Sequence, residues 1–343
     1  MPAQATPFGT LADGRPVRSV AIAWPGGLSL EVIEYGASVR SLRAGAAGGT
    51  AVETVLGFAD LASYEADRSY QGRAVGRCAN RIDHARFEID GEHFQVAANE
   101  GETCLHGGPG GFSDRLWRIE ATGADGCSVS LAYDSADGEE GFPGVVQARV
   151  HFSLTAADTL EIVWEATTSR ACPVNLTHHL YFNLSGDPGG SMLDHSLRVA
   201  ADAITPVRPD LIPTGALLDV TGTPFDLRQP RRLDEALALA HPQLAIGGGY
   251  DHNWVLAAGA RDAAVLSSPA TGLSLHLATD QPGLQIYSGQ GLTAPFAAHG
   301  GLALEPQGFP DAVNQPTFPN VVLRPGQMYR RWARYRFVAG GEG

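Results

Sequence analysis

The feature that most constrains the fold is a series of short runs in which apolar and polar residues alternate. The clearest is Arg86–Val96, written R-F-E-I-D-G-E-H-F-Q-V, where Asp90 and Gly91 separate two alternating halves. An Asp-Gly pair in this position favours a type I′ turn, so the segment is predicted to be a β-hairpin. Val17–Trp24 and Leu28–Tyr35 alternate with the same period of two and are predicted strands.

Further segments extend this pattern along the chain. Strands are predicted at Cys127–Tyr133, Val145–Leu154, Thr159–Thr168, Leu273–Thr279, Leu284–Ser288 and Met328–Val338. Two segments have helical character: Asp60–Arg68, which begins with a capping aspartate, and Arg231–Ala240, whose apolar residues share one face. With 42 glycines and 22 prolines for turns, and no repeat or linker, residues 1–343 are predicted to form a single, mostly antiparallel all-β domain.

The composition excludes several classes of ligand and of chemistry. The formal charge of -13 opposes binding to nucleic acid, to an anionic membrane or to a phosphorylated substrate, and a neutral ligand fits better. The chain contains no lysine, so all 24 basic residues are arginine. Lysine Schiff-base chemistry, including attachment of pyridoxal phosphate, and the P-loop lysine are therefore excluded.

The compartment is predicted from cysteine usage and from the N-terminal sequence. The four cysteines, Cys78, Cys104, Cys127 and Cys172, form no C-x-x-C pair and are expected to be reduced thiols in or near the core. The first residues lack the basic start and apolar run of a signal peptide, and no stretch is long enough to span a bilayer. A soluble cytoplasmic protein is expected.

One stretch near the C-terminus carries the strongest chemical signal, Leu302–Asn320, L-A-L-E-P-Q-G-F-P-D-A-V-N-Q-P-T-F-P-N. An apolar run leads directly into Glu305, and Pro306 follows it. A strand is expected to stop at Pro306 because proline cannot donate to a β ladder. An apolar approach desolvates a carboxylate and raises its pKa, as in many general bases. The alternative interpretation, which this stretch supports equally well, is an ordinary surface glutamate at a strand end.

Three other turn-rich segments concentrate polar residues. G-R-C-A-N-R-I contains Asn80 and Arg81, which offer an amide and a planar fork of donors suited to sugar hydroxyls or a carboxylate. L-H-G-G-P-G-G places His106 before glycines that allow close approach of the backbone. N-L-T-H-H-L-Y-F-N-L-S-G contains His178 and His179, which face opposite sides of a strand, so the two are not expected to bind one metal.

Two more polar residues complete the set. Asp251, in G-G-G-Y-D-H-N-W-V-L, follows a flexible turn and precedes an apolar strand, and Gln285 opens the short strand I-Y-S. A turn-capping aspartate, a turn asparagine and a buried histidine are the ordinary structural interpretations of such residues. Together, however, these residues are the parts needed to bind a neutral polyol, with aromatic side chains as stacking faces.

In this order, the motifs A-N-R-I, L-H-G-G, T-H-H-L-Y-F-N, I-P-T-G-A, Y-D-H-N-W and L-E-P-Q-G-F-P-D-A-V-N resemble those of the aldose 1-epimerases, the galactose mutarotase family. The resemblance runs from about Phe8 to about Val338. It implies a large β-sandwich, the galactose-mutarotase-like supersandwich, with a few short helices and a polar cleft. It also implies interconversion of the α and β anomers of a free aldose without a metal or organic cofactor.

The resemblance also assigns roles to individual residues. By its position in the motifs, Glu305 resembles the residue that acts as general base in the family, and His179 resembles the residue that acts as general acid. The implied sugar-binding set is Asn80, Arg81, His106, Asp251 and Gln285. His106 is a rival for the acid role. The sequence departs from the usual family pattern at His178, Leu180, Pro306 and Gly308, which leaves the sugar preference and a role for His178 open.

Three other functions compete with this interpretation. A sugar-binding or sensing protein on the same fold would need no acid and base, but both are present here. A glycoside hydrolase needs two carboxylates at the scissile bond, and Asp251 with Glu305 would have to serve. A phosphosugar epimerase is disfavoured by the acidic charge. Galactose, glucose, xylose and arabinose all stay open as substrates, and the sequence does not define an oligomeric state.

Overall fold

The computed structural model describes residues 3–46, 49–187 and 189–340. Its largest element is a nine-stranded sheet whose strand pairs are all antiparallel. In spatial order its strands are β11 (Arg118–Thr122), β12 (Ser128–Ser135), β13 (Val146–Ala156), β14 (Thr159–Thr168), β28 (Tyr329–Ala339), β24 (Leu273–Thr279), β23 (Ala264–Ser267), β18 (Ser196–Val199) and β21 (Arg231–Arg232).

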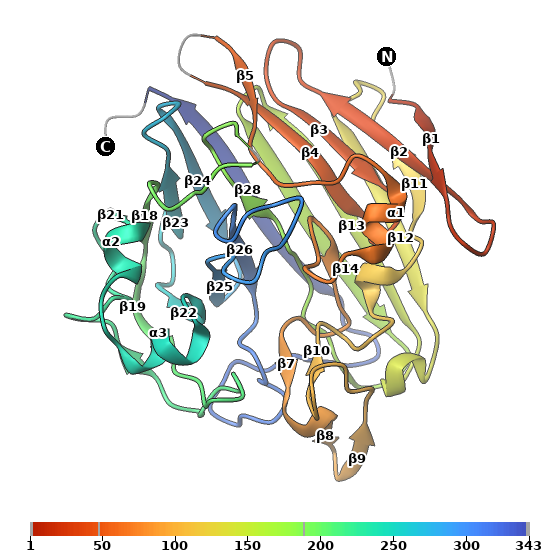
Figure 1. Ribbon diagram of the computed structural model, residues 1–343. Coiled ribbons are helices and arrows are strands. Elements are labelled where there is room, and N and C mark those ends of the chain that lie inside the picture. Colours follow the sequence, from red (N-terminus) through yellow and green to blue (C-terminus); the bar gives the residue numbers. More distant parts are fainter. Residues whose placement is uncertain (1–2, 47–48, 188, 341–343) are drawn as a thin grey trace.

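Two smaller antiparallel sheets lie over the nine-stranded sheet (Figure 1). A five-stranded sheet contains β1 (Ala5–Thr10), β2 (Pro16–Ala23), β3 (Ser29–Ile33), β4 (Ser38–Gly45) and β5 (Ala51–Glu53) in chain order. A six-stranded sheet has the order β17 (Tyr181–Phe182), β26 (Leu302–Gln307), β25 (Gly283–Tyr287), β22 (Asp251–Leu256), β19 (Ala201–Thr205) and β20 (Leu218–Asp219).

Short elements fill the connections between the sheets. Four two-stranded ladders pair β7 (Arg81–Ile82) with β10 (Cys104–Leu105), β6 (Ala74–Val75) with β16 (Thr177–His178), β8 (Arg86–Ile89) with β9 (Glu92–Gln95), and β15 (Cys172–Pro173) with β27 (Val322–Leu323). The helices are α1 (Leu61–Ala66), α2 (Leu233–Leu237) and α3 (Pro242–Gly247), with 3-10 turns at Asp83–Ala85, Phe112–Asp114 and Glu139–Gly141. The predicted all-β antiparallel fold with a few short helices is confirmed.

One hydrophobic cluster contains side chains from all three sheets. Val32 of the five-stranded sheet, Leu304 of the six-stranded sheet and Phe152 of the nine-stranded sheet are at most 1% exposed and belong to it. Phe182 on β17 and Tyr335 on β28 bring the six-stranded and nine-stranded sheets into contact, with ring centroids 5.5 Å apart. Burial of this shared apolar surface holds the layers together. The four cysteines are buried and unpaired.

Local sequence signals located several elements correctly. In the predicted hairpin, Asp90 and Gly91 both have positive φ, of 56° and 81°, as a type I′ turn requires. Asp60 caps α1 by accepting the backbone N–H of Ser63 at 2.9 Å. The predicted strands Thr159–Thr168 and Leu273–Thr279 coincide with β14 and β24.

Two predictions of element boundaries were wrong. The helix predicted at Arg231–Ala240 is only the five residues of α2, because Arg231 and Arg232 pair with β18 instead. Strand β26 does not stop at Pro306 but continues to Gln307, which pairs with Gly283. The N–H of Leu304 points toward the β17 side, where it donates to Leu180 O. The nitrogen of Pro306, two residues on, faces the same side beyond the start of β17, so no ladder bond is lost.

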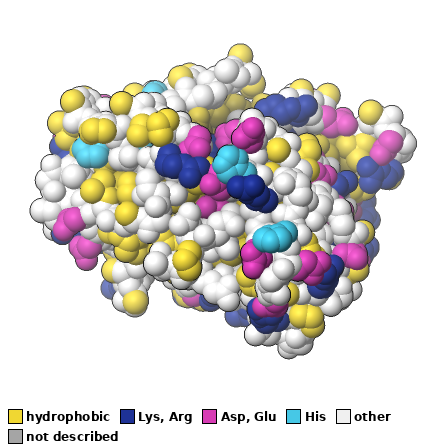
Figure 2. Space-filling view, turned by 90° about the horizontal axis from the view of Figure 1, so that it is seen from below, with side chains coloured by type: hydrophobic (Ala, Val, Ile, Leu, Met, Phe, Trp, Pro, Cys, Tyr) yellow, Lys and Arg dark blue, Asp and Glu magenta, His cyan; other side chains and the backbone are white. Residues whose placement is uncertain are grey.

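The surface mixes charges of both signs. Arg324, Arg330 and Arg334 each lie beside a carboxylate, with Asp90, Glu165 and Glu161 as partners. Figure 2 shows dark blue and magenta side chains interspersed on one face of the molecule, with neither sign forming a continuous field there. In the part of the chain that the structure describes, no helix is both long enough and apolar enough to cross a membrane.

Candidate active site

A polar cleft of about 750 Å³ opens beside the six-stranded sheet. Residues from far apart in the sequence form its wall. Six of the seven predicted site residues line it: Asn80, Arg81, His106, His179, Asp251 and Glu305. The seventh, Gln285, is not part of the wall: it lies behind Asp251 and donates from Nε2 to Asp251 Oδ1 at 2.6 Å. The structure therefore brings the predicted residues together, with Gln285 in a supporting position.

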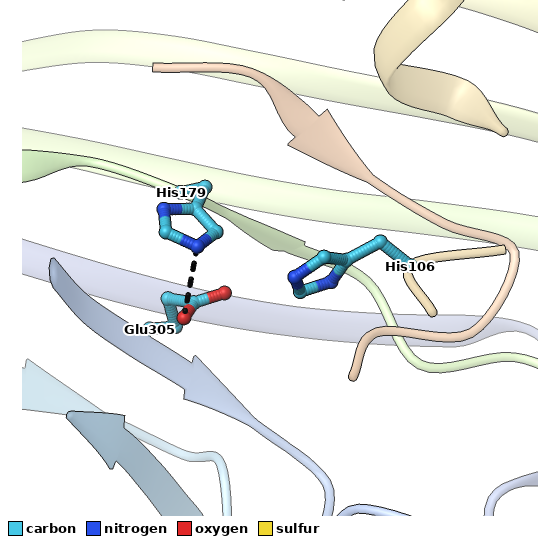
Figure 3. Close-up of side chains that lie close together, drawn as sticks. All are labelled: His106, His179 and Glu305. Atoms are coloured by element: carbon cyan, nitrogen blue, oxygen red, sulfur yellow. Dashed lines mark ion pairs between the residues drawn. The ribbon is translucent and has the colours of Figure 1, made fainter. Parts of the chain in front are cut away.

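Glu305 and His179 meet at the base of the cleft. His179 Nε2 lies 3.5 Å from Glu305 Oε1, and the two side chains are 6% and 2% exposed. In Figure 3 the His179 ring points at the Glu305 carboxylate, and the His106 ring faces both. His179 lies between β16 and β17, where its N–H donates to Arg73 O and its carbonyl accepts from Gly72 N, both at 2.9 Å. These backbone bonds fix the imidazole opposite β26.

Burial shifts the pKa values of this pair in opposite directions. It raises the pKa of the Glu305 carboxyl well above its usual range; the nearby Asp251 carboxylate raises it further, and Arg81 lowers it. Burial lowers the pKa of the His179 imidazole to about 4, although Asp67 and Asp251 act in the other direction. The cause in both cases is that a buried site disfavours the charged form. The predicted rise for Glu305 is confirmed.

The environment of His106 identifies its proton-bearing nitrogen. The ring Nδ1 accepts the backbone N–H of Asn80 at 3.2 Å, and His106 N donates back to Asn80 O at 2.9 Å. Burial, His179 and Arg81 together lower the pKa of His106 well below its usual value, so the ring is neutral. A neutral imidazole that accepts at Nδ1 carries its proton on Nε2. His106 therefore presents an N–H donor.

Arg81 and Asp251 form a rigid polar wall. Arg81 donates from Nη2 to Glu100 Oε1 at 2.9 Å and from Nη1 to Asp251 Oδ2 at 3.4 Å. Gln285 holds the other oxygen of Asp251. Because both partners of Arg81 are carboxylates, the buried guanidinium is neutralised and its remaining donors are fixed in direction. Hydroxyl groups of a ligand would meet preset donors and acceptors here.

Glu100 and Tyr70 line the cleft and contact predicted site residues, but they were not found from the sequence. Glu100 holds Arg81, but nothing in its own segment marks it as functional. Tyr70 lies at ring-centroid distances of 6.0 Å from His179 and 4.6 Å from His106. Its backbone is left-handed, with φ of 61°, which is uncommon for a bulky residue and often found at functional sites. The carboxylate of Asp67 stabilises this turn by accepting the N–H groups of Ser69 and Gln71.

The adjacent histidines face opposite sides, as predicted. His178 lies in the core, where its Nδ1 accepts from Trp164 Nε1 at 2.8 Å and its Nε2 lies 3.1 Å from Ala37 O. The role that the sequence left open for His178 has no support in this placement. Phe309 and Phe318 pack on each other with centroids 5.2 Å apart and do not belong to the cleft wall.

Three side chains of the site have the donor types of a metal centre. Ligand atoms of His106, His179 and Glu305 lie within 4.8 Å of one another. However, the nitrogen of His106 that faces the cleft carries a proton, and freeing it for a metal would cost the bond to Asn80 N. The arrangement suits proton transfer better than metal binding.

Comparison with known proteins gives one consistent result. Residues 18–336 match the family described as aldose 1-epimerase. The chain is 38% identical to the galactose mutarotase of Rattus norvegicus, covering 90% of this chain and 91% of that one, and 36% identical to the aldose 1-epimerase of Escherichia coli K12, covering 95% and 97%. A solved aldose epimerase homologue from C. elegans superposes with a TM-score of 0.86 at 30% identity, covering 93% and 98%. The chain belongs to the aldose 1-epimerase family.

Proposed function

We propose that this protein is an aldose 1-epimerase, which interconverts the α and β anomers of a free aldose by opening and closing the sugar ring. The observation that carries the proposal is the contact of 3.5 Å between His179 Nε2 and Glu305 Oε1 at the buried base of a polar cleft. Ring opening removes a proton from O1 and adds one to O5, and both oxygens are bonded to C1. Two proton-transfer groups in contact match that requirement.

Glu305 is the base and His179 the acid in the opening step. The Glu305 carboxylate takes the proton from O1 while the His179 imidazolium gives one to O5. The C1–O5 bond breaks with its electron pair going to O5, and a C1–O1 double bond forms. Rotation about C1–C2 then presents the other face of the aldehyde, and the same two transfers in reverse close the ring. The two groups supply both transfers, so the reaction needs no cofactor.

The pKa shifts fit a pair that shares one proton. Burial raises the pKa of Glu305 and lowers that of His179, so between the two values the pair binds a single proton, which these directions place mainly on Glu305. The form that opens the ring carries the same proton on His179 and leaves Glu305 ionised; it is the less populated of the two arrangements. Ring opening moves the proton from the imidazole to the carboxylate, and ring closure moves it back. The proton count of the site stays constant through the cycle. Apparent pKa values of such a contact belong to the pair and not to either residue.

The other residues of the cleft position the sugar. The Nε2–H of His106 donates to the ring oxygen or to a neighbouring hydroxyl, and Arg81 with Asp251 holds hydroxyls at the far side of the ring. Asn80 fixes His106 through its backbone. Correct orientation is worth several orders of magnitude in rate. The name of the rat relative supports galactose as one substrate.

The alternative of a sugar-binding protein without catalysis predicts a different result in one experiment. Glu305→Gln keeps the shape and hydrogen-bonding capacity of the side chain but cannot accept the O1 proton. We expect this variant to fold and to bind galactose, and to show mutarotation at the spontaneous rate when followed by polarimetry on freshly dissolved α-D-galactose.

Two controls complete the experiment. Thermal unfolding of Glu305→Gln, measured beside the wild-type protein, separates loss of chemistry from loss of fold. Wild-type protein that leaves the spontaneous rate unchanged would favour the binding alternative. Undiminished catalysis in the variant would remove Glu305 from the role of base.

A further inference from the structure

A row of polar side chains crosses the six-stranded sheet at the level of Glu305. Glu305 on β26 lies opposite Gln285 on β25, Gln285 lies opposite Asn253 on β22, and Asn253 lies opposite Thr205 on β19. Residues directly opposite in antiparallel strands share one face, with Cβ atoms about 5 Å apart. The four side chains therefore lie side by side on the face that carries the base, and Gln307, two residues after Glu305, is on that face as well.

Gly283 leaves space for this row of side chains, and Phe309 covers it. Gly283 lies between Val255 and Gln307 in the next register of the same face, and a Cβ atom there would collide with Asn253 Oδ1. The Asn253 amide therefore occupies the space above Gly283 on β25. Phe309 Cδ1 would be 3.0 Å from the same Cβ, so the aromatic ring closes the row from above.

The row contains hydrogen-bonding atoms that the protein leaves unpaired. Among the described residues, no partner lies within reach of either amide atom of Asn253, either amide atom of Gln307, Gln285 Oε1, Thr205 Oγ1 or Glu305 Oε2. Asn253, Gln285 and Gln307 are at most 2% exposed. A buried polar atom left unpaired is destabilising, so seven along one row need another source of hydrogen bonds.

Three amides and a carboxylate oxygen give a water molecule the two to four polar partners that a buried water requires. A ligand hydroxyl is not the partner of the amides, because Asn253, Gln285 and Gln307 do not belong to the cleft wall. The unpaired Glu305 Oε2 belongs to the carboxylate whose other oxygen contacts His179.

We propose that Asn253 and Gln307 are positioning residues for the base: together with Gln285 they hold ordered water against Glu305 Oε2, and so fix the orientation of the carboxylate and favour its charged form. The inference rests on the proposed function. Water-mediated donors act on a carboxylate nearly as well as direct ones. They offset part of the burial that opposes ionisation of Glu305, without touching the sugar.

The test replaces Gln307 by an apolar side chain of similar length. Gln307→Met removes the amide while keeping the volume close to that of the native side chain. Loss of the donors raises the pKa of Glu305, so we expect kcat to fall at least tenfold and the alkaline limb of the kcat–pH profile to move to higher pH. KM should stay within about twofold, since Gln307 does not line the cleft.

A matched control uses a second buried glutamine. Gln281 is 5% exposed, donates to Leu176 O and Tyr329 Oη, and lines a separate cavity of about 220 Å³. Gln281→Met should lower Tm and leave the kcat–pH profile unchanged. Should Gln307→Met fail to fold, Asn253→Ser carries the same test with the same expected shift.

The outcomes separate this inference from the proposed function. A folded Gln307→Met protein whose kcat and pH profile coincide with wild type would overturn the positioning role, while an inactive Glu305→Gln would still support the base. If Glu305→Gln itself keeps full activity, the proposed function fails first. A crystal structure with water bonded to Glu305 Oε2 and to at least one of the amides supports the inference. Amides paired only with one another would overturn it.

Discussion

At the scale of single residues, the proposed mechanism depends on one proton shared by Glu305 and His179. Both groups are buried, and burial separates their pKa values: it raises the pKa of the carboxyl and lowers the pKa of the imidazole to about 4. The singly protonated pair therefore exists across a broad range of pH. Asp251 and Arg81 tune this range from the cleft wall, since the first raises and the second lowers the pKa of Glu305.

The first prediction is a bell-shaped dependence of kcat/KM on pH. As pH falls through about 4 the pair gains a second proton, and Glu305 can no longer accept one from O1. As pH rises through the elevated pKa of Glu305 the pair loses its shared proton, and His179 can no longer donate to O5. Polarimetry corrected for spontaneous mutarotation measures both limbs. Activity that stays constant into strongly alkaline solution would contradict the shared-proton mechanism.

The two adjacent histidines give a second prediction. His178→Leu leaves the N–H of Trp164 unpaired in the core, which should cost about 1–3 kcal/mol of unfolding free energy, while activity per folded molecule is retained. His179→Gln should do the reverse, with a small change in stability and mutarotation close to the spontaneous rate. Denaturant unfolding and polarimetry on both variants measure the contrast. Equal losses of activity would mean that the two histidines are not separated as the structure places them.

Sequence motifs located most of the candidate site but not its supporting residues. Glu305 and His179 stand in segments whose polar residues are conspicuous among apolar neighbours. Tyr70, Glu100 and Gln307 carry no such signal: Tyr70 lies in a backbone turn held by Asp67, and the role proposed for Gln307 depends on its lying on the same face of β26 as Glu305. Such placements depend on tertiary contacts, which local sequence does not encode.

At the scale of elements, predictions held where the determinants are local. The turn at Asp90-Gly91 and the Asp60 cap depend on a few neighbouring residues, and both were predicted. The extent of β26 depends on which side of the strand has a partner, so Pro306 could not be interpreted from sequence alone. The division of the strands into three sheets depends on long-range pairing for the same reason.

A pair of strand glycines gives a prediction at this scale. Gly283→Ala places a methyl group against Asn253 Oδ1 and Phe309, both buried, so β25 must shift from its neighbours, and we expect a loss of about 1–3 kcal/mol. Gly45→Ala, at the end of β4, meets no atom within 4 Å and should change stability by less than about 0.5 kcal/mol. Urea denaturation measures both. Equal stabilities would show that β25 has space for the methyl group.

At the scale of the whole molecule, the negative net charge of the protein and the excess of carboxylates in the cleft both repel anionic ligands. The formal charge is -13, and the cleft wall holds Asp67, Glu100, Asp251 and Glu305 against Arg68 and Arg81. Arg81 is already neutralised by two carboxylates. A neutral sugar experiences no long-range force in this field, whereas an anionic sugar is repelled from the cleft.

The last prediction follows from this charge distribution. Raising ionic strength from about 0.01 to about 1 M shortens the screening length from about 30 to about 3 Å. We expect kcat/KM for galactose to stay constant over this range, because neither encounter nor the buried contact between His179 and Glu305 depends on screened charges. Galacturonate, the matched anionic sugar, should react poorly at low salt and better as salt rises, because screening weakens its repulsion. A steep loss of galactose mutarotation with salt would show that exposed charges take part in binding, contrary to a cleft in which Arg81 is already paired with two carboxylates.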